Sequence, residues 1–337
     1  MNKIPIVAIT MSEAAGIGPE ILVKALAGEE IAAFCRPIAI GDAKVMRKAV
    51  ESTGTNVGFN VIKKFEEAKF EPKRPDLIDL DNIPLEKLHP SHPDAITGRA
   101  MLDYTRYAVD LFLAKKIDGA IGGPHSKKAA EEAGEHFDGY PGLIAKITNS
   151  PHPYLMLVSG GLRVSNVTLH VSLRNALAML DRALVLNCIR ESDKAVKAFG
   201  IAKPRLAVAG LNPHAGEERM FGDEDEDIIK PAIADAVKEG INATGPYPAD
   251  SLFYGCLTND RFDAYIAMYH DQAHLPVKAL VFKSASAMAI GVPVNWATVD
   301  HGCALDIAWK GVADPAVLIE TVKLISGRAP TFRQFFK

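Results

Sequence analysis

The stretch IPIVAITMSEAAGIGPE, residues 4–20, sets the pattern that the rest of the chain repeats. Residues 4–10 are a mostly apolar run, interrupted by Pro5, that predicts a β-strand, and the pair Gly18-Pro19 predicts the start of a helix. The glycines permit a tight turn, and the free N–H groups of a helix start can bind an anion. The stretch is neither a G-x-G-x-x-G nor a P-loop motif. A plain turn that leads into a helix is therefore the alternative interpretation.

The same alternation of strands and helices continues along the chain. Further strands are predicted at 37–40, 119–122, 154–158, 163–169, 205–209 and 265–269, and helices at 19–26, 97–116, 173–200 and 225–238. Several strands are continuous apolar runs, which is typical of sheets covered on both faces. The polar, proline-rich segment 64–93 is expected to be surface structure. We therefore predict an α/β fold with an at least partly parallel sheet.

Composition excludes several classes of protein. The 337 residues suggest about two domains of roughly 150 residues each. The net charge of −3 argues against a protein that binds nucleic acid through bulk positive charge. The four cysteines contain no CxxC pair, which predicts reduced thiols rather than disulfides or a cysteine-zinc site. No apolar segment is long enough for a signal peptide or a membrane span, so we expect a cytoplasmic protein with no membrane partner.

Three histidines each follow a predicted strand or sit in the turn after one: His170, His214 and His270. Ligands of α/β sheets bind at the carboxyl ends of strands, so three such imidazoles can converge on one metal, and zinc or a similar divalent ion suits them. The alternative is three separately hydrogen-bonded loop histidines. His274 stands four residues after His270, but Pro276 follows, so we expect no helix there and interpret His274 as an outer or substrate contact.

Several other residue types near these turns can carry chemistry. Asp250, Asp271 and Asp300 lie in predicted turns, where a carboxylate can act as a base or orient a ligand, or simply form an Asx turn. Lys278 is a candidate anion contact or proton donor. Cys303 is expected to be a buried small residue, because nothing in the sequence indicates a lowered thiol pKa.

Five ordered segments together resemble a known family: AGIGPE at 15–20, LNPHAGE at 211–217, GPYPADSLF at 245–253, YHDQ at 269–272 and VDHG at 299–302. The chain resembles the 4-hydroxythreonine-4-phosphate dehydrogenase (PdxA-type) family of metal-dependent NAD(P) enzymes from its first strand to about Gly311. The resemblance implies a two-domain α/β/α fold similar to isocitrate and isopropylmalate dehydrogenases, with the active site in the interdomain cleft. Residues 1–135 plus 285–337 would form the first domain with the nucleotide loop. Residues 136–284 would form the second, with the metal site and dimer interface.

The resemblance also implies roles for individual residues. The metal ligands are then His170, His214 and His270, one of them supplied by the partner in a homodimer whose sites are shared between subunits. One divalent metal is expected per site, zinc first, with cobalt, manganese, magnesium or iron as alternatives. The implied catalytic positions are Asp250, Asp271 and Lys278.

The segment DHGCALDIAWKG, residues 300–311, looks like the loop that holds the adenine side of the nucleotide in these enzymes. The residues that it would bring to NAD or NADP are Asp300, His301, Gly302 and Asp306.

The chain departs from the family pattern at its substrate contacts. A His-Thr pair of the family falls on Tyr140 and Pro141, an asparagine falls on or near Ala287, and an arginine falls on Trp296. These changes remove a cation and add aromatic surface, which disfavours a phosphate dianion. Lys278 is retained and can bind a carboxylate. The expected substrate contacts are thus Tyr140, Lys278 and Trp296.

Three functions remain open at this point. The first hypothesis is oxidation of a hydroxyl beta to a carboxylate with decarboxylation, most simply of a terephthalate-derived cis-dihydrodiol to protocatechuate in aromatic catabolism. The second is a dehydrogenase for 4-hydroxythreonine 4-phosphate or a related phosphorylated sugar acid. The third is a non-catalytic binding protein on the same scaffold, against which the presence of all three histidines argues.

Overall fold

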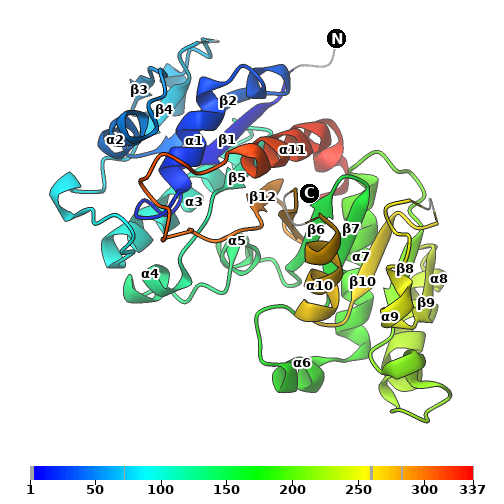
Figure 1. The fold of residues 1–337 in the computed structure, drawn as a ribbon. Coiled ribbons are helices and arrows are strands. Elements are labelled where there is room, and N and C mark those ends of the chain that lie inside the picture. The colour runs from blue at the N-terminus through cyan, green and yellow to red at the C-terminus, as the bar shows by residue number, and fades with distance from the viewer. Residues whose placement is uncertain (1–3, 72, 259–260, 282–283, 337) are drawn as a thin grey trace. The chain divides into compact units, whose positions relative to one another are not determined.

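The computed structural model describes residues 4–71, 73–258, 261–281 and 284–336. It divides into two compact units, Met1–Ile147 with Val294–Pro330 and Thr148–Pro293 with Thr331–Lys337, so the second unit interrupts the first in sequence. Each unit combines a sheet with helices, which confirms the predicted α/β class (Figure 1). The predicted domain division at 135/136 and 284/285 stays a prediction.

The sheet of the first unit is parallel throughout its described pairs. Its strand order is β3-β4-β2-β1-β5-β12, and every residue of β1 is buried. The strands are β1 (Ile6–Thr10), β2 (Arg36–Gly41), β3 (Asn60–Ile62), β4 (Asp76–Asp79), β5 (Gly119–Gly122) and β12 (Trp296–Val299). The prediction that 64–93 is only surface structure is wrong, because β4 pairs with β2 and β3. Its short Asp-Leu-Ile-Asp run was too brief to stand out among polar and proline residues.

Helices begin where local residues satisfy their first N–H groups. Asp42 accepts hydrogen bonds from two backbone N–H groups at the start of α2, and Asp94 forms a capping box with Thr97 at the start of α3. Pro19 stands in the first turn of α1, as predicted. The helices that begin in this unit are α1 (Gly18–Ala27), α2 (Ala43–Thr53), α3 (Ala95–Leu113), α4 (Lys127–Glu132), α5 (Tyr140–Thr148) and α11 (Ala316–Phe335).

The sheet of the second unit is mixed. Its order is β11-β6-β7-β10-β8-β9, in which β6 pairs antiparallel with β7 and β11, while β7, β10, β8 and β9 run parallel. The strands are β6 (Tyr154–Ser159), β7 (Leu162–Asn166), β8 (Leu206–Ala209), β9 (Ala243–Tyr247), β10 (Ala264–Ala267) and β11 (Ser286–Ile290). The partly parallel sheet predicted from the sequence is thus confirmed.

Two helix predictions in this unit are wrong. The segment 173–200 is two helices, because Asp181 leaves the helical conformation and caps the second one. Residues 270–281 are a helix despite Pro276, which costs a single backbone donor. The helices are α6 (Leu173–Met179), α7 (Arg182–Lys197), α8 (Lys230–Lys238, which follows a π-helical turn at Asp225–Ile229), α9 (Ala249–Leu252) and α10 (His270–Val281).

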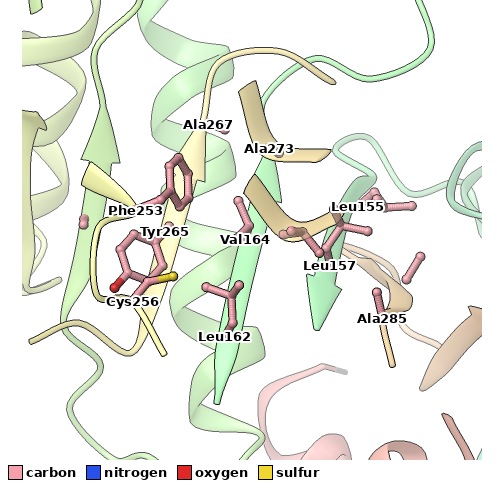
Figure 2. Packing of buried hydrophobic residues seen from close by; sticks show 13 residues of the cluster. Leu155, Leu157, Leu162, Val164, Phe253, Cys256, Tyr265, Ala267, Ala273 and Ala285 are labelled. Carbon is pink, nitrogen blue, oxygen red and sulfur yellow. The ribbon is translucent and has the colours of Figure 1, made fainter. Parts of the chain in front are cut away.

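Apolar side chains pack α10 onto its sheet. Ala273 and Val277 of α10 join a buried cluster with residues of β6, β7, β8, β10 and β11. Figure 2 shows Phe253 beside Tyr265 in this cluster, and their ring centroids lie 5.4 Å apart. This packing fixes the position of α10, and with it the position of His270 at its first residue.

The cysteines are all free and buried, which agrees with the sequence analysis. Burial raises the thiol pKa of Cys303 to about 12, so this residue is not an activated nucleophile. No helix in the described ranges is long and apolar enough to cross a membrane.

The turn between β1 and α1 contains a buried acid. Glu13 is fully buried, and its Oε1 accepts a hydrogen bond from the backbone N–H of Ala15 at 3.0 Å. Desolvation raises the pKa of Glu13 to about 7, although hydrogen bonds from Ala15 and Thr97 offset part of the effect. The native protein therefore holds this proton up to near-neutral pH.

Replacing Glu13 by Gln is expected to change how stability depends on pH. An unfolded chain ionises this carboxyl near pH 4.5, whereas the folded chain ionises it near pH 7. The free energy of unfolding of the wild type therefore decreases as the pH rises from 4.5 to 7. The loss is on the order of 3 kcal/mol and persists above pH 7. Urea unfolding at pH 5 and pH 8 should show the wild type losing stability relative to Glu13→Gln. An equal difference at both pH values would contradict the buried-acid assignment.

The segment after β8 has an unusual backbone. Residues 214–219 all have positive φ, between +38° and +79°, and five of the six are not glycine. L-residues in this left-handed region cost roughly 1–2 kcal/mol each and normally occur singly. A run of six therefore persists only because the surrounding structure holds it.

Glu218→Gly tests this strain directly. Glu218 is exposed with φ +53°, so glycine is expected to raise the free energy of unfolding by about 1 kcal/mol. The matched control is Glu51→Gly. Glu51 is exposed in the right-handed helix α2, so glycine there should lower the free energy of unfolding by about 1 kcal/mol. Chemical denaturation measures both. Destabilisation by both variants would show that the left-handed backbone is not strained.

Candidate functional site

The ends of β7 and β10 bring two of the predicted metal ligands together. These strands pair in parallel, with Tyr265 opposite Val164, and the pairing continues past them through Val167 N–H and Ala267 O at 2.8 Å. The segments that follow β7 and β10 therefore leave the sheet at the same edge. The ring centroids of His170 and His270 lie 5.7 Å apart there.

These two imidazoles face a cavity of about 290 Å³. Asp271, Tyr269 and the first residue of α6, Leu173, also line it. Two imidazoles and a carboxylate are the nitrogen and oxygen donors that first-row divalent cations take in proteins. The donor set present fits such a cation.

His270 is oriented by its neighbours. Its Nδ1 lies 2.7 Å from Asp271 Oδ1 and therefore donates to that carboxylate, which leaves the lone pair on Nε2. The ring of His274 stacks on His270 at 3.7 Å, and His274 Nδ1 donates to the His270 carbonyl at 3.0 Å. His274 thus packs against His270 from within a helix that the sequence analysis did not expect, and its role as an outer or substrate contact stays a prediction.

His214 occupies the left-handed segment that follows β8. It is exposed with φ +54°, and its ring centroid lies 5.9 Å from that of Phe221. Among the described residues, the three predicted ligands do not form a group whose nitrogen atoms all lie within 4.8 Å of one another. The structure therefore brings His170 and His270 together and leaves the placement of His214 in the same site as a prediction.

The predicted catalytic residues of the second unit lie on two short helices. Asp250 is exposed in the first turn of α9, while Asp271 and Lys278 lie seven residues apart on α10. Residues at this spacing are two helical turns apart on one face. Asp271 and Lys278 therefore share a side of α10 that starts at His270.

A second group of possible metal ligands lies in the first unit. The carboxylate oxygens of Asp42, Asp79 and Asp81 lie within 4.8 Å of one another. Protein donors already occupy them, since Asp42 caps α2, Asp79 accepts from Ala43 N–H at 2.9 Å, and Asp81 pairs with Lys44 at 2.6 Å. We interpret this group as a structural cluster.

The four predicted nucleotide residues lie in one loop after β12. Asp300 and His301 are half-buried, whereas Gly302 and Asp306 are exposed. β12 pairs in parallel with β5, so the loop leaves the carboxyl end of a parallel strand, which is where α/β sheets bind nucleotides. This position fits NAD or NADP, and the role of the four residues stays a prediction.

The sequence analysis missed the residues that hold this loop. The buried carboxylate of Glu20 in α1 accepts hydrogen bonds from Trp309 N–H at 2.7 Å and Gly311 N–H at 2.5 Å. One helical turn later, Lys24 Nζ donates to the carbonyls of Gly311 and Ala313, both at 2.7 Å. Glu20 was inconspicuous because an acidic residue in a first helical turn is ordinary.

Tyr140 and Trp296 lie together inside the first unit. Both are buried, their ring centroids are 5.2 Å apart, and His125 packs edge-on against Tyr140 at 4.9 Å. The phenol of Tyr140 hydrogen-bonds with Ser12 Oγ and Gly123 O, both at 3.1 Å. Their aromatic surface therefore packs against protein neighbours. Ala287, in β11, is also buried.

Comparisons with known proteins agree with this architecture. The family model described as pyridoxal phosphate biosynthetic protein PdxA matches residues 33–325. A protein of Symbiobacterium thermophilum, provisionally named D-threonate 4-phosphate dehydrogenase, is 40% identical over 334 residues, 99% of each chain.

Two solved structures are similar over most of their length. A 4-hydroxythreonine-4-phosphate dehydrogenase from Burkholderia phymatum has a TM-score of 0.84 and 38% identity, over 97% of this chain and 99% of that one. A terephthalate 1,2-cis-dihydrodiol dehydrogenase from Burkholderia xenovorans has a TM-score of 0.66 and 35% identity, over 96% and 98%. The family match and these likenesses place the chain in the PdxA family.

Proposed function

We propose that the chain is a metal-dependent NAD(P) dehydrogenase that oxidises the hydroxyl of a phosphorylated hydroxy acid. The substrates that we favour are 4-hydroxythreonine 4-phosphate, D-threonate 4-phosphate and compounds of the same class. Full-length similarity to a relative named for such a substrate carries the proposal. The dehydrogenase class and the use of NAD(P) and a divalent cation follow from membership of the family.

The terephthalate dihydrodiol, our first hypothesis, is not supported. The relative from Symbiobacterium thermophilum and the structure from Burkholderia phymatum are both named for phosphorylated substrates, and the latter has a higher TM-score than the dihydrodiol dehydrogenase. That hypothesis also relied on an aromatic wall at Tyr140 and Trp296, yet both rings are buried against one another. The comparisons give no support to a decarboxylation step, and we do not include one.

Each candidate residue has a role that its contacts suggest. His170, His214 and His270 would hold the cation, zinc first, which when bound polarises the substrate hydroxyl and stabilises developing negative charge. Asp271 keeps the Nδ1 proton of His270 in place, so its Oδ1 is engaged. Asp250 is exposed and is therefore our candidate for the base that takes the hydroxyl proton.

The remaining roles concern binding of the two organic molecules. Lys278 would supply positive charge to the anionic group of the substrate. Asp300, His301, Gly302 and Asp306 would bind NAD(P), which supplies the hydride acceptor when bound. Glu20 and Lys24 keep the backbone of that loop in a fixed conformation.

We also propose a homodimer whose metal sites are shared. Ala176 is the one buried residue of helix α6. The larger apolar side chains of this helix are largely exposed: Leu173 is 57% exposed, Leu177 48% and Met179 50%. Apolar side chains gathered on one short helix are typical of a protein contact. This helix begins three residues after His170, so a partner seated on it would lie beside the metal site.

Turnover assays test the substrate class. Purified protein with divalent metal and NAD or NADP should reduce the nucleotide with 4-hydroxythreonine 4-phosphate or D-threonate 4-phosphate. Unphosphorylated D-threonate is the matched control and should react far more slowly, because it lacks the dianion. Reduction with the dihydrodiol alone would overturn the proposal. Bound metal without any turnover would favour the non-catalytic alternative.

Pairwise mixtures of variants test the shared site. His170→Ala, His214→Ala and His270→Ala should each bind the metal too weakly to retain it during purification, with a residual affinity that titration at higher Zn²⁺ concentration still measures. After subunit exchange, two of the three pairwise mixtures are expected to regain metal at one site per hybrid dimer, and the third at none. The two productive mixtures have in common the histidine that crosses to the partner. Metal measured in separated hybrid dimers gives the result, and recovery in no mixture would exclude sharing.

A further inference from the structure

The side chain of Gln272 bridges the ends of two strands. Its Oε1 accepts a hydrogen bond from Met268 N–H at 2.7 Å, and its Nε2 donates to the carbonyl of Gly210 at 2.8 Å. The backbone pairing of β10 with β8 ends at Ile266 and Val208. The primary amide therefore continues this pairing beyond the strands, with the donor and acceptor of a peptide group.

A second contact extends the bridge to β7. The hydroxyl of Thr168 donates to the carbonyl of Met268 at 2.9 Å, so the backbone of Met268 is bound through its N–H by Gln272 and through its C=O by Thr168. Thr168 lies two residues before His170, Met268 two before His270, and Gly210 four before His214. The hydrogen-bonded chain thus joins the backbones that lead to all three histidines.

A buried carboxylate fixes the far end of this chain. Asp225 accepts from Leu211 N–H at 2.8 Å and from Asn212 N–H at 3.1 Å, and the Asn212 side chain donates to it at 3.0 Å. Asp225 is fully buried. It holds the two residues that follow Gly210 and so fixes where the left-handed segment, with His214, begins.

We propose that Gln272 is a positioning residue that keeps the His214 segment in register with His270 for metal binding. This inference rests on the proposed metal site. Gln272 acts through the backbone and does not touch the cation. Partners that orient metal ligands typically change metal affinity about 10- to 100-fold when removed, which is the effect expected here.

The positioning role of Gln272 can be measured as the change in metal affinity of the Gln272→Met variant. Methionine keeps the size and flexibility of the side chain and removes both hydrogen bonds. Zn²⁺ titration against a chelator is expected to show affinity at least tenfold weaker than in the wild type. Gln334→Met, the same change at an exposed position of α11, is the matched control and should bind like the wild type.

A double variant separates positioning from general damage. If Gln272 acts by placing His214, then Gln272→Met should weaken Zn²⁺ binding much less in a His214→Ala background. Hydrogen exchange at residues 210–222 should speed up in Gln272→Met and stay unchanged in Gln334→Met. Unchanged affinity, equal losses in both backgrounds or unchanged exchange would each overturn the inference.

Two further results separate this inference from the proposed function. A wild type that binds no Zn²⁺ would overturn the metal site itself, and the inference with it, whereas a wild type that binds Zn²⁺ beside an unaffected Gln272→Met would overturn the inference alone. Gln272→Asn keeps a primary amide but shortens the side chain by one methylene, so it cannot reach both Met268 N–H and the Gly210 carbonyl. If Gln272→Met does not fold, Gln272→Asn should still weaken Zn²⁺ binding, and wild-type affinity in it would contradict the inference.

Discussion

The parallel pairing of β7, β10 and β8 is the constraint on which the candidate metal site depends. Parallel neighbours end at one edge of the sheet, so residues far apart in sequence leave it side by side, as His170 and His270 do. The antiparallel strand β6 makes this direction possible, because it returns the chain through a tight turn into β7. A register shift of one residue between β7 and β10 would move their ends relative to one another, and with them the segments that carry His170 and His270.

Buried carboxylates hold the loops at both candidate sites. Glu20 accepts two backbone N–H groups of the predicted nucleotide loop, and Asp225 accepts two at the start of the His214 segment. A buried charge is costly unless hydrogen bonds replace its lost hydration, and backbone N–H groups supply these hydrogen bonds to both carboxylates. Such a carboxylate fixes backbone positions that propensity alone leaves free. It thereby permits the positive φ of Trp309 and of the run that begins at His214.

The sequence was sufficient for what local pattern controls. Continuous apolar runs located β1, β5, β6, β8 and β10 to within a few residues, and the rule that sites follow strand ends paired His170 with His270. It failed where tertiary contacts decide. β4 has too few residues to show a period, and α10 forms around Pro276 because its apolar side packs on the sheet.

The supporting residues of the site were also invisible to pattern. Glu20 and Gln272 end two of the segments that carry the family resemblance, but their supporting roles, like that of Asp225, depend on partners between 4 and 291 residues away. Nothing in residue type or spacing distinguishes them from solvated side chains. Only the folded backbone shows which N–H and C=O groups they bind.

Tyr140 and Trp296 show why residue type alone does not define a pocket. A Cβ added at Gly122 would come within 2.4 Å of the Tyr140 ring, so that ring occupies space that only a glycine leaves open. The Tyr140 phenol also uses Ser12 and Gly123, and Trp296 packs against the ring. These residues form one interlocked set in the core of the first unit. A phosphorylated substrate would therefore draw its charge-assisted hydrogen bonds from other side chains, which makes Lys278 and the exposed helix α6 the places to look for phosphate recognition.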